Sequence, residues 1–253
     1  MRRAPRIVTG ETMSERTAII TGAGKRVGAA LARALLDDGW SVVAHVRTDS
    51  DEVPDGTSRV VADLEDPSAA AVIVEAADGL PPLELLVNNA ARFADDGFGR
   101  FSATEFDSHM AINVRAPAML IEAFVQVAPR GSLVVNLLDA KLAAPNPDFL
   151  SYTLSKQALA GLTEVAARSL AGQGIRVNAI APALMLPSGA QDDSNFARVH
   201  ALNPLGCGVE PADVARALRY LIAATAVTGE VMTIDGGQRF WQLARDVQFL
   251  EEQ

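Results

Sequence analysis

The sequence has 253 residues, of which 49% are hydrophobic and 21% are charged, and its formal net charge is −9. This length and composition suit one large α/β domain with a sizeable apolar core, while the acidic balance excludes a basic nucleic-acid footprint and disfavours an anionic membrane surface. A single cysteine rules out an intramolecular disulfide, and no apolar run is long enough to span a bilayer. We therefore expect a soluble cytoplasmic protein.

Strand-like and helix-like segments alternate along the chain. Strands are predicted at residues 17–21, 41–46, 58–62, 83–87, 132–137, 175–180 and 230–234. Helices are predicted at 26–38, 67–77, 103–127 (two helices that meet near Asn113), 151–170 and 211–224, with a short helix inside 183–208. This alternation predicts a single-domain Rossmann-type, doubly wound parallel sheet in a three-layer αβα sandwich, spanning residues 17–253. Residues 1–16, with an alternative start at Met13, are expected to form a disordered tail.

A glycine-containing turn, Thr21-Gly22-Ala23-Gly24-Lys25-Arg26-Val27-Gly28, joins the first predicted strand to its helix. Such a turn lets a diphosphate approach the backbone, and the helix N-terminus offers free N–H groups and a positive dipole end. The same glycines could serve packing alone. Their position between a first strand and a helix favours a dinucleotide site.

The end of the second predicted strand indicates which dinucleotide binds. Arg47 stands where an acidic residue would hydrogen-bond the ribose of NAD, and its guanidinium can pair with a 2′-phosphate. Thr48 and Lys25 can add contacts to the same phosphate. Asp49, just beyond, favours NAD instead, and Arg47 could be a solvated surface cation. On balance the sequence predicts NADPH/NADP as the cofactor.

Tyr152 and Lys156 stand four residues apart on a predicted helix, which places both on one face. A free tyrosine has a pKa of about 10, and a nearby ammonium favours the phenolate. A phenol that donates a proton while a hydride arrives would reduce a C=O or C=N bond. Tyrosine and lysine at this spacing are common on helices, so the pair gains meaning only beside the cofactor turn.

Together these motifs resemble the short-chain dehydrogenase/reductase family over residues 17–240. The matching segments are Thr21-Gly22-x-x-x-Arg26-x-Gly28, Asp63-Leu64, Asn88-Asn89-Ala90-Ala91, Asn113, Tyr152-x-x-x-Lys156, Arg176-Val177-Asn178, Pro182 and Asp235-Gly236-Gly237. The resemblance implies that Tyr152 donates the proton, that Lys156 binds the nicotinamide ribose and lowers the tyrosine pKa, and that Asn113 holds a water of the proton relay. It implies a homotetramer and these further cofactor contacts: Gly22, Lys25, Arg26, Val27, Asp63, Leu64, Asn88, Ala90 and Pro182.

Two departures from the family pattern resemble its pteridine reductase and dihydromonapterin reductase branch. Arg26 replaces a glycine, and Asp139 replaces a serine about thirteen residues before the tyrosine. In that branch the arginine faces the cofactor phosphates and the substrate, and the aspartate joins the Tyr/Lys pair as a catalytic residue. An aromatic at the position of Phe93 there stacks the pterin against the nicotinamide.

Three observations count against this narrower resemblance. Ala91 stands where that branch usually has a serine, and Arg92 adds a charge beside it. The segment 184–203, expected to border the substrate, has no clear signature. Asp139 could also be a structural acid paired with Lys141.

The preferred function is an NADPH-dependent reductase that transfers hydride to a C=N or C=O bond of a small molecule. A dihydropterin or dihydrofolate-type substrate is favoured, with Arg26, Phe93, Asp139 and Tyr152 at the substrate. Reduction of a 3-oxoacyl thioester or another ketone is the alternative, and a non-catalytic NADP(H)-binding sensor or scaffold is an alternative of another class. With three scattered histidines and one cysteine, no metal site is expected, and neither is a nucleic-acid or membrane partner.

Overall fold

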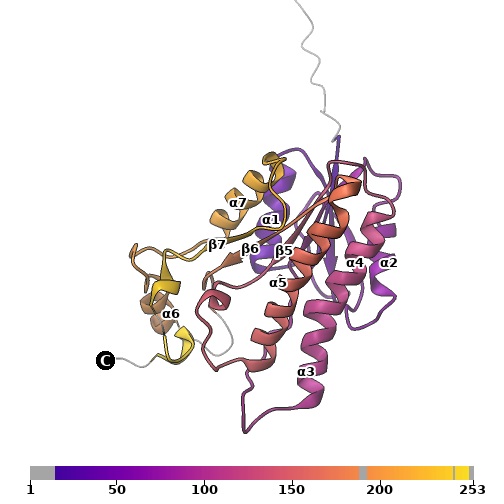
Figure 1. Ribbon diagram of the computed structural model, residues 1–253. Helices are drawn as coiled ribbons and strands as arrows, with labels where there is room; N and C mark the ends of the chain where they lie inside the picture. The colour runs from indigo at the N-terminus through magenta and orange to yellow at the C-terminus, as the bar shows by residue number, and fades with distance from the viewer. Residues whose placement is uncertain (1–14, 188–192, 242, 251–253) are drawn as a thin grey trace, which may run out of the picture.

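Seven parallel strands form one sheet at the centre of the computed structural model, which describes residues 15–187, 193–241 and 243–250 (Figure 1). The strands are β1 (Thr17–Ile20), β2 (Ser41–Val46), β3 (Ser58–Val61), β4 (Leu83–Asn88), β5 (Leu133–Leu137), β6 (Arg176–Pro182) and β7 (Val231–Ile234). Their order is β3-β2-β1-β4-β5-β6-β7, and every neighbouring pair is parallel. The order reverses between β1 and β4, where a doubly wound sheet leaves a crevice at the carboxyl ends of its strands.

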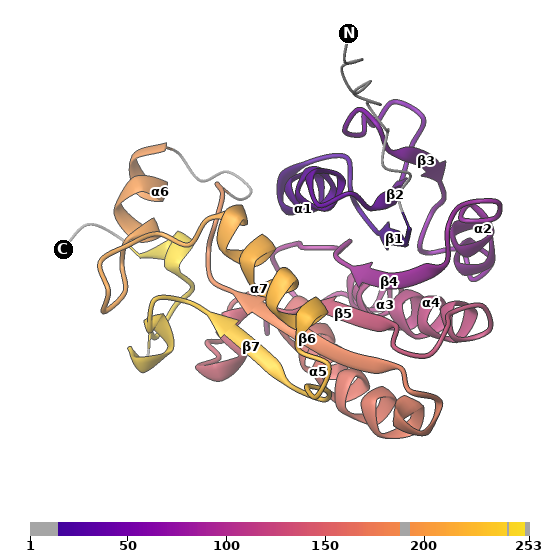
Figure 2. The same cartoon turned by 90° about the horizontal axis from the view of Figure 1, so that it is seen from above.

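Helices cover both faces of this sheet, as Figure 2 shows. On one face α1 (Arg26–Asp37) packs beside α7 (Pro211–Ala223). The other face carries α2 (Ala69–Glu75), α4 (Ala116–Val125) and α5 (Leu150–Leu170), with α3 (Ala103–Met110) against α5. The predicted three-layer αβα sandwich is therefore confirmed.

The core is built from aliphatic side chains because the chain is poor in aromatics, which make up only 5% of the residues. Successive residues of a strand point to opposite faces of the sheet. In β2, Val42 packs into the cluster beneath α1 and α7, while Val43 packs into the cluster beneath α2, α4 and α5. Both faces are buried, which explains why the strands read as continuous apolar runs.

The junction between α3 and α4 is a π-helix, Ala111–Arg115. The sequence predicts two helices that meet near Asn113, and the structure places Asn113 inside this wider turn, fully buried. Pro117, near the start of α4, lacks an N–H group and fits the first turn of a new helix. The two helices are therefore continuous in the chain but differ in register.

Two predicted segments fall partly outside the described residues. Residues 1–14 of the expected tail lie outside the described residues, whereas Arg16 is described and contacts the fold. Its carbonyl accepts a hydrogen bond from Ser41 N at 3.0 Å, and its guanidinium lies 4.0 Å from the Trp40 ring centroid. In the segment after β6, residues 188–192 also lie outside the described residues. The short helix predicted inside residues 183–208 is α6 (Asp193–His200). In the described part of the chain, no helix is both long and apolar enough to cross a membrane.

Candidate active site

A cavity of about 720 Å³ opens at the carboxyl ends of the strands, across the switch point between β1 and β4. Most of the residues predicted for the site line it: Gly22, Lys25, Arg26, Val27, Arg47, Asp63, Leu64, Ala90, Phe93, Asp139, Tyr152, Lys156 and Pro182. Thr48, Asn88 and Asn113 are not among its lining residues. The fold thus brings together the glycine turn, the end of β2 and the start of α5.

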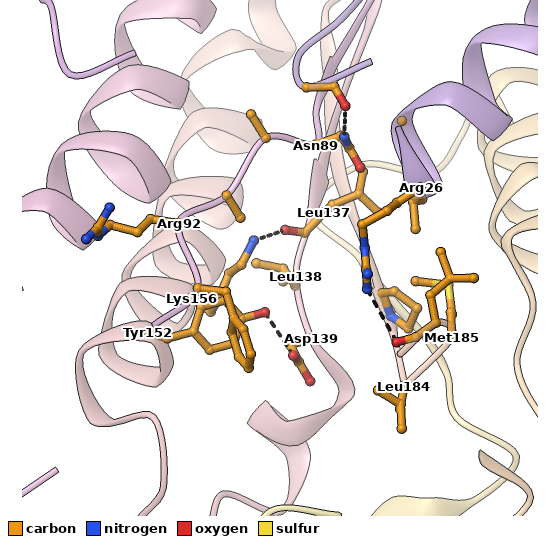
Figure 3. A pocket seen from close by; sticks show the side chains of 18 of the residues that line it. Arg26, Asn89, Arg92, Leu137, Leu138, Asp139, Tyr152, Lys156, Leu184 and Met185 are labelled. Atoms are coloured by element: carbon orange, nitrogen blue, oxygen red, sulfur yellow. Dashed lines mark hydrogen bonds between the residues drawn. The ribbon is translucent and has the colours of Figure 1, made fainter. Parts of the chain in front are cut away.

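The glycine turn is held in shape by a close backbone approach. A Cβ added at Gly28 would lie 2.2 Å from the Gly22 carbonyl oxygen, so residue 28 must be glycine. Asn89 fastens the turn, because its Nδ2 donates to the carbonyls of Thr21 at 2.8 Å and Gly22 at 3.1 Å (Figure 3). Asn89 belongs to the motif Asn88-Asn89-Ala90-Ala91, but the sequence alone does not indicate this contact. The signal available was its position directly after β4, the neighbour of β1.

Arg26 adopts a left-handed backbone with a φ of +54°. Glycine takes this conformation without a steric penalty, which explains why the resembled family has glycine at this position. The Arg26 guanidinium donates to the carbonyls of Pro187 at 2.6 Å and Leu186 at 3.3 Å. It therefore links the glycine turn to the segment that follows β6 (Figure 3).

His45, near the end of β2, is a site residue that sequence reasoning missed. Its Nδ1 accepts the Gly22 N–H at 3.2 Å, and its Nε2 lies 3.0 Å from the Ala62 carbonyl. One neutral tautomer satisfies both contacts, with the proton on Nε2. Burial lowers the pKa of His45, which keeps the ring neutral. A lone histidine in a strand gives no sign of such a contact.

The end of β2 differs in detail from the expected phosphate site. Arg47 and Lys25 line the cavity as expected. Thr48, however, donates its hydroxyl to Asp51 Oδ2 at 2.9 Å, and Asp51 also lines the cavity. Hydrogen bonds from Thr48 lower the pKa of Asp51, so a carboxylate stands beside the two cations. Asp49 turns away to Arg59, 3.7 Å distant.

Tyr152, Asp139 and Lys156 converge at the carboxyl end of β5 (Figure 3). The Tyr152 hydroxyl donates to Asp139 Oδ2 at 2.9 Å, and Lys156 Nζ donates to the Leu137 carbonyl at 2.6 Å. Asp139 lies two residues after the end of β5, and Tyr152 lies in the first turn of α5. That turn is capped by Asp96, whose carboxylate accepts from the backbone N–H and the hydroxyl of Ser151.

Burial shifts the pKa values of this group. Burial and the negative charge of Asp139 raise the pKa of the Tyr152 phenol well above its ordinary value. Burial lowers the pKa of Lys156 to about 8. The family resemblance implied the opposite direction for the tyrosine, through Lys156. In the structure Lys156 Nζ points to the Leu137 carbonyl, 5.7 Å from the Tyr152 ring centroid, while Asp139 is in direct contact.

Asn113 and Asn88 make structural contacts behind the cavity. The Asn113 side chain accepts from Arg92 N at 2.8 Å and donates to Arg92 O at 3.0 Å and Ser155 Oγ at 2.8 Å. Asn88 Nδ2 donates to Asn136 at 2.8 Å, and both residues are buried. The predicted water of Asn113 and the predicted cofactor contact of Asn88 stay predictions.

Phe93 lies beside the tyrosine, and its ring is 39% exposed. Its centroid is 4.7 Å from that of Tyr152 in an edge-on contact and 4.4 Å from that of Phe149 in a stacked one. One face of Phe93 is therefore covered and the other is open to a ligand. Arg92 points away from Tyr152 (Figure 3) and forms a bidentate pair with Glu105, 2.7 and 3.1 Å long.

The alternative in which Asp139 pairs with the Lys141 side chain is not what the structure contains. Asp139 Oδ1 accepts the backbone N–H of Lys141 at 2.8 Å. The Lys141 ammonium instead lies 3.5 Å from Asp246 Oδ2 and donates to the Asp148 carbonyl at 2.5 Å. The Asp139 carboxylate is thus left to Tyr152. Among the described residues, no group of three or more His, Cys, Asp and Glu side chains could hold a metal ion.

Comparison with known proteins agrees with this fold. Residues 22–239 match the profile of a family described as enoyl-(acyl carrier protein) reductase. 3β-Hydroxysteroid dehydrogenase 1 of Eggerthella lenta is 30% identical, with 91% of this chain and 96% of that protein covered. The chain belongs to the short-chain dehydrogenase/reductase family, and its fold is that of an oxidoreductase of this family.

Solved structures give two further comparisons. FolM alternative dihydrofolate reductase 1 from Brucella canis, complexed with NADP, is 32% identical with a TM-score of 0.83, covering 92% of this chain and 97% of that one. The angucycline C-6 ketoreductase LanV, with bound NADP, is 26% identical with a TM-score of 0.80, covering 90% and 97%. The similar proteins therefore include both a dihydrofolate reductase and a ketoreductase.

Proposed function

We propose that this protein is an NADPH-dependent reductase that transfers hydride to a C=N or C=O bond, with a dihydropterin or dihydrofolate-type substrate. The observation that carries the proposal is the 2.9 Å hydrogen bond from Tyr152 to Asp139. An aspartate here, with Phe93 on the same cavity, matches the pteridine reductase branch. The likeness to a FolM dihydrofolate reductase supports the same substrate class.

The residues around the glycine turn fit a dinucleotide phosphate. The close approach of Gly28 to Gly22 leaves no room for side chains where a diphosphate would meet the backbone. Lys25 and Arg47 line the same end of the cavity and would hold a 2′-phosphate. NADP is bound in the FolM and LanV structures, which supports NADPH over NADH. Asp51 stands beside these cations and would weaken phosphate binding without abolishing it.

The chain's own residues account for the proton. A bound NADPH would supply the hydride. Tyr152 turns its hydroxyl from Asp139 to the substrate and gives its proton to the nitrogen or oxygen of the bond being reduced. Its raised pKa keeps the phenol protonated at neutral pH, which suits the reductive direction. The ammonium of Lys156 stabilises the phenolate that remains, and Asn113 supports a water through which the proton is restored.

A ring nitrogen favours the aspartate over a serine at position 139. Reduction of a C=N bond requires a proton on nitrogen, and a carboxylate can hold a ring N–H or pass on its proton. The open face of Phe93 can stack a planar heterocycle. Ketone or 3-oxoacyl thioester reduction is the second candidate, favoured by the likeness to the ketoreductase LanV.

Oxidation of NADPH with several acceptors tests the substrate class. Dihydrobiopterin, dihydromonapterin and dihydrofolate should be reduced, and acetoacetyl thioester should not. Turnover on the thioester alone would replace the pterin proposal with the ketone candidate. Binding of NADPH without turnover on any acceptor would favour a non-catalytic sensor or scaffold.

Tyr152→Phe should reduce kcat by about a hundredfold to ten-thousandfold, because the variant lacks the proton donor while keeping the ring. The affinity for NADPH, measured by nicotinamide fluorescence, should change less than threefold. A matched variant, Tyr220→Phe, removes an exposed hydroxyl on α7 and should leave both quantities unchanged. Full turnover by Tyr152→Phe would contradict the mechanism.

We further propose that the protein acts in the cytoplasm as a homotetramer. Family resemblance and the exposed apolar side chains Leu154 and Val165 of α5 support the oligomer, and the single cysteine is compatible with a reducing compartment.

A further inference from the structure

The C-terminal segment, defined here as residues 243–250, returns to the cavity after the last strand. In Figures 1 and 2 it is the yellow stretch beside α6, and Arg198 of α6 donates to the Leu250 carbonyl at 2.5 Å. Four of its residues line the cavity together with Tyr152 and Asp139: Leu243, Asp246, Val247 and Gln248. None of the sequence motifs covers this segment.

Contacts at the start of α5 fix the segment in place. Arg245 Nε donates to Asp148 Oδ2 at 2.8 Å, and the Asp246 backbone N–H donates to the same oxygen at 2.8 Å. The Phe249 ring stacks on Phe149, with centroids 5.5 Å apart. The segment is thus held from both sides, against α5 and against α6, so the side chain at position 246 has a defined location.

Asp246 is a largely buried carboxyl whose acceptor sites are only partly used. Its side chain is 14% exposed, and Lys141 Nζ lies 3.5 Å from Oδ2, while Oδ1 accepts the Gln248 N–H at 3.2 Å. An ionised carboxylate has about four acceptor sites, so these two contacts leave sites for a ligand. Burial raises the pKa of Asp246 and Lys141 opposes that rise. Its charge also raises the Tyr152 pKa, which places it near the reacting end of the cavity.

We propose that Asp246 is a specificity-determining residue: its carboxylate accepts hydrogen bonds from hydroxyl or amino groups on the substituent next to the bond that is reduced. The inference rests on the proposed reductase function of this cavity. Tyr152, Lys156 and Asp139 act at the bond that is reduced, whereas Asp246 would recognise the substituent next to that bond.

The position of the tyrosine gives the geometric reason. The reduced bond must lie at the Tyr152 hydroxyl, and Asp246 lines the same cavity, so a substituent one or two bonds away can reach the Asp246 carboxylate. A hydroxylated side chain on a dihydropterin carries suitable donors, and hydrogen bonds to a charged acceptor are stronger than neutral ones. An alkyl group at this place would displace the water bound to the carboxylate without replacing its hydrogen bond. Leaving a buried acceptor unsatisfied costs binding free energy. The carboxylate therefore favours donor-bearing substrates in two ways.

A purely structural role for Asp246 makes different predictions. It caps the short 3₁₀ turn Val247–Phe249 and pairs with Lys141. If that were its whole function, substitutions would change stability and affect all ligands alike. Asp246→Asn and Asp246→Ser both keep a side chain that can cap this turn while removing the charge. The serine also withdraws the acceptor from the cavity.

The test compares two fluorescent ligands that differ in their donors, biopterin and 6-methylpterin, in titrations of the full-length protein with NADP present. The wild type should prefer biopterin, and Asp246→Ser should lower that preference about tenfold, equivalent to one lost charged hydrogen bond. Asp246→Asn should lower it less. Asp213→Asn, which alters a capping carboxylate on α7 away from the cavity, should leave the preference unchanged. Circular dichroism confirms that each variant is folded.

Turnover of 7,8-dihydrobiopterin and 6-methyl-7,8-dihydropterin separates this inference from the proposed function. A rise in KM for the hydroxylated substrate alone, with kcat maintained, supports the role of Asp246. If the wild type reduces no dihydropterin but its biopterin preference depends on Asp246, the proposed substrate is wrong and the donor site stands. An equal biopterin preference in wild type and both Asp246 variants overturns the inference, whatever the turnover.

Discussion

Two non-glycine residues in the described part of the chain have a left-handed backbone, Arg26 and Phe149. Arg26 lines the cavity, and Phe149 packs on Phe93, which also lines it. Arg26 ends the glycine turn and reaches the segment after β6. Phe149 precedes α5 and stacks between Phe93 and Phe249. Residues held in this conformation cost of order 1–3 kcal/mol and persist where their surroundings fix them. Glycine at either position would avoid this cost but would lack the side chain that makes these contacts.

At the residue scale, Lys156 predicts a pH dependence with two opposite trends. Burial lowers its pKa to about 8, so its ammonium is lost above that pH and kcat/KM should fall there. Between pH 8 and about 10.5 the unfolded chain keeps a proton that the folded chain has released, so the contribution of Lys156 to the free energy of unfolding rises with pH. Rate profiles and urea unfolding from pH 7 to 10 measure both.

Lys156→Met is the comparison for the stability trend. This variant should lack the part of the pH dependence due to Lys156, so its unfolding free energy should rise less between pH 8 and 10 than that of the wild type. A wild-type kcat/KM that stays constant to pH 9.5 would contradict the lowered pKa of Lys156.

At the scale of elements, the turn between β1 and α1 is joined to the segment after β6 through Arg26. Arg26→Gly removes the left-handed strain and the bonds to Leu186 and Pro187, while Arg26→Ala removes only the bonds. The glycine variant should therefore be more stable than the alanine variant by about 1 kcal/mol. Both should raise the substrate KM similarly.

Thermal unfolding and steady-state kinetics check this pair of variants. An alanine variant more stable than the glycine variant would mean that residue 26 leaves the left-handed region once its guanidinium is gone. An unchanged KM in both variants would show that the link to the segment after β6 does not affect substrate binding.

Elements with strong local patterns were predictable from the sequence. The apolar runs of β1, β2, β4 and β5, and the glycine turn before α1, predicted the strands and the doubly wound parallel sheet, whereas the strand order and the switch point come from the structure. The spacing of Tyr152 and Lys156 placed both on the cavity. Contacts between segments distant in sequence were not predictable: Asn89 on the glycine turn, His45 against Gly22, and Asp246 in the cavity depend on tertiary packing that a local pattern does not encode.

Local chemistry also changed the expected roles of some residues. The hydroxyl of Thr48 donates to Asp51, three residues further on, and Thr48 does not line the cavity. Arg92 also lines the cavity, but its guanidinium pairs with Glu105 on α3. The residue type predicts which hydrogen bonds and ion pairs each side chain can form, and the fold determines which partner it contacts.

At the scale of the whole molecule, the outer face of α5 predicts self-association. Leu154 and Val165 are 41% and 62% exposed, and eleven residues make about three helical turns, which places them on one face. Exposed apolar side chains that lie together mark interaction surfaces. We expect a homotetramer in sedimentation velocity, and Val165→Glu should shift it to smaller species.

Val127→Glu is the matched control, since Val127 is also exposed, at 56%, but lies beyond α4 rather than on α5. It should leave the sedimentation coefficient unchanged. A wild-type protein that sediments as a monomer at micromolar concentration would contradict the proposed assembly.

The π-helix between α3 and α4 acts as a phase shift in the helical repeat. Each residue of an α-helix advances about 100° around its axis, and a π-turn accommodates one residue more than an α-turn. Without it, the face of α4 that carries Leu120 and Phe124 would rotate by about that angle away from the sheet. The widened turn therefore lets two consecutive helices each present the correct face: α3 packs against α5, and α4 packs against the core. Asn113 lies at the point where the helical phase changes.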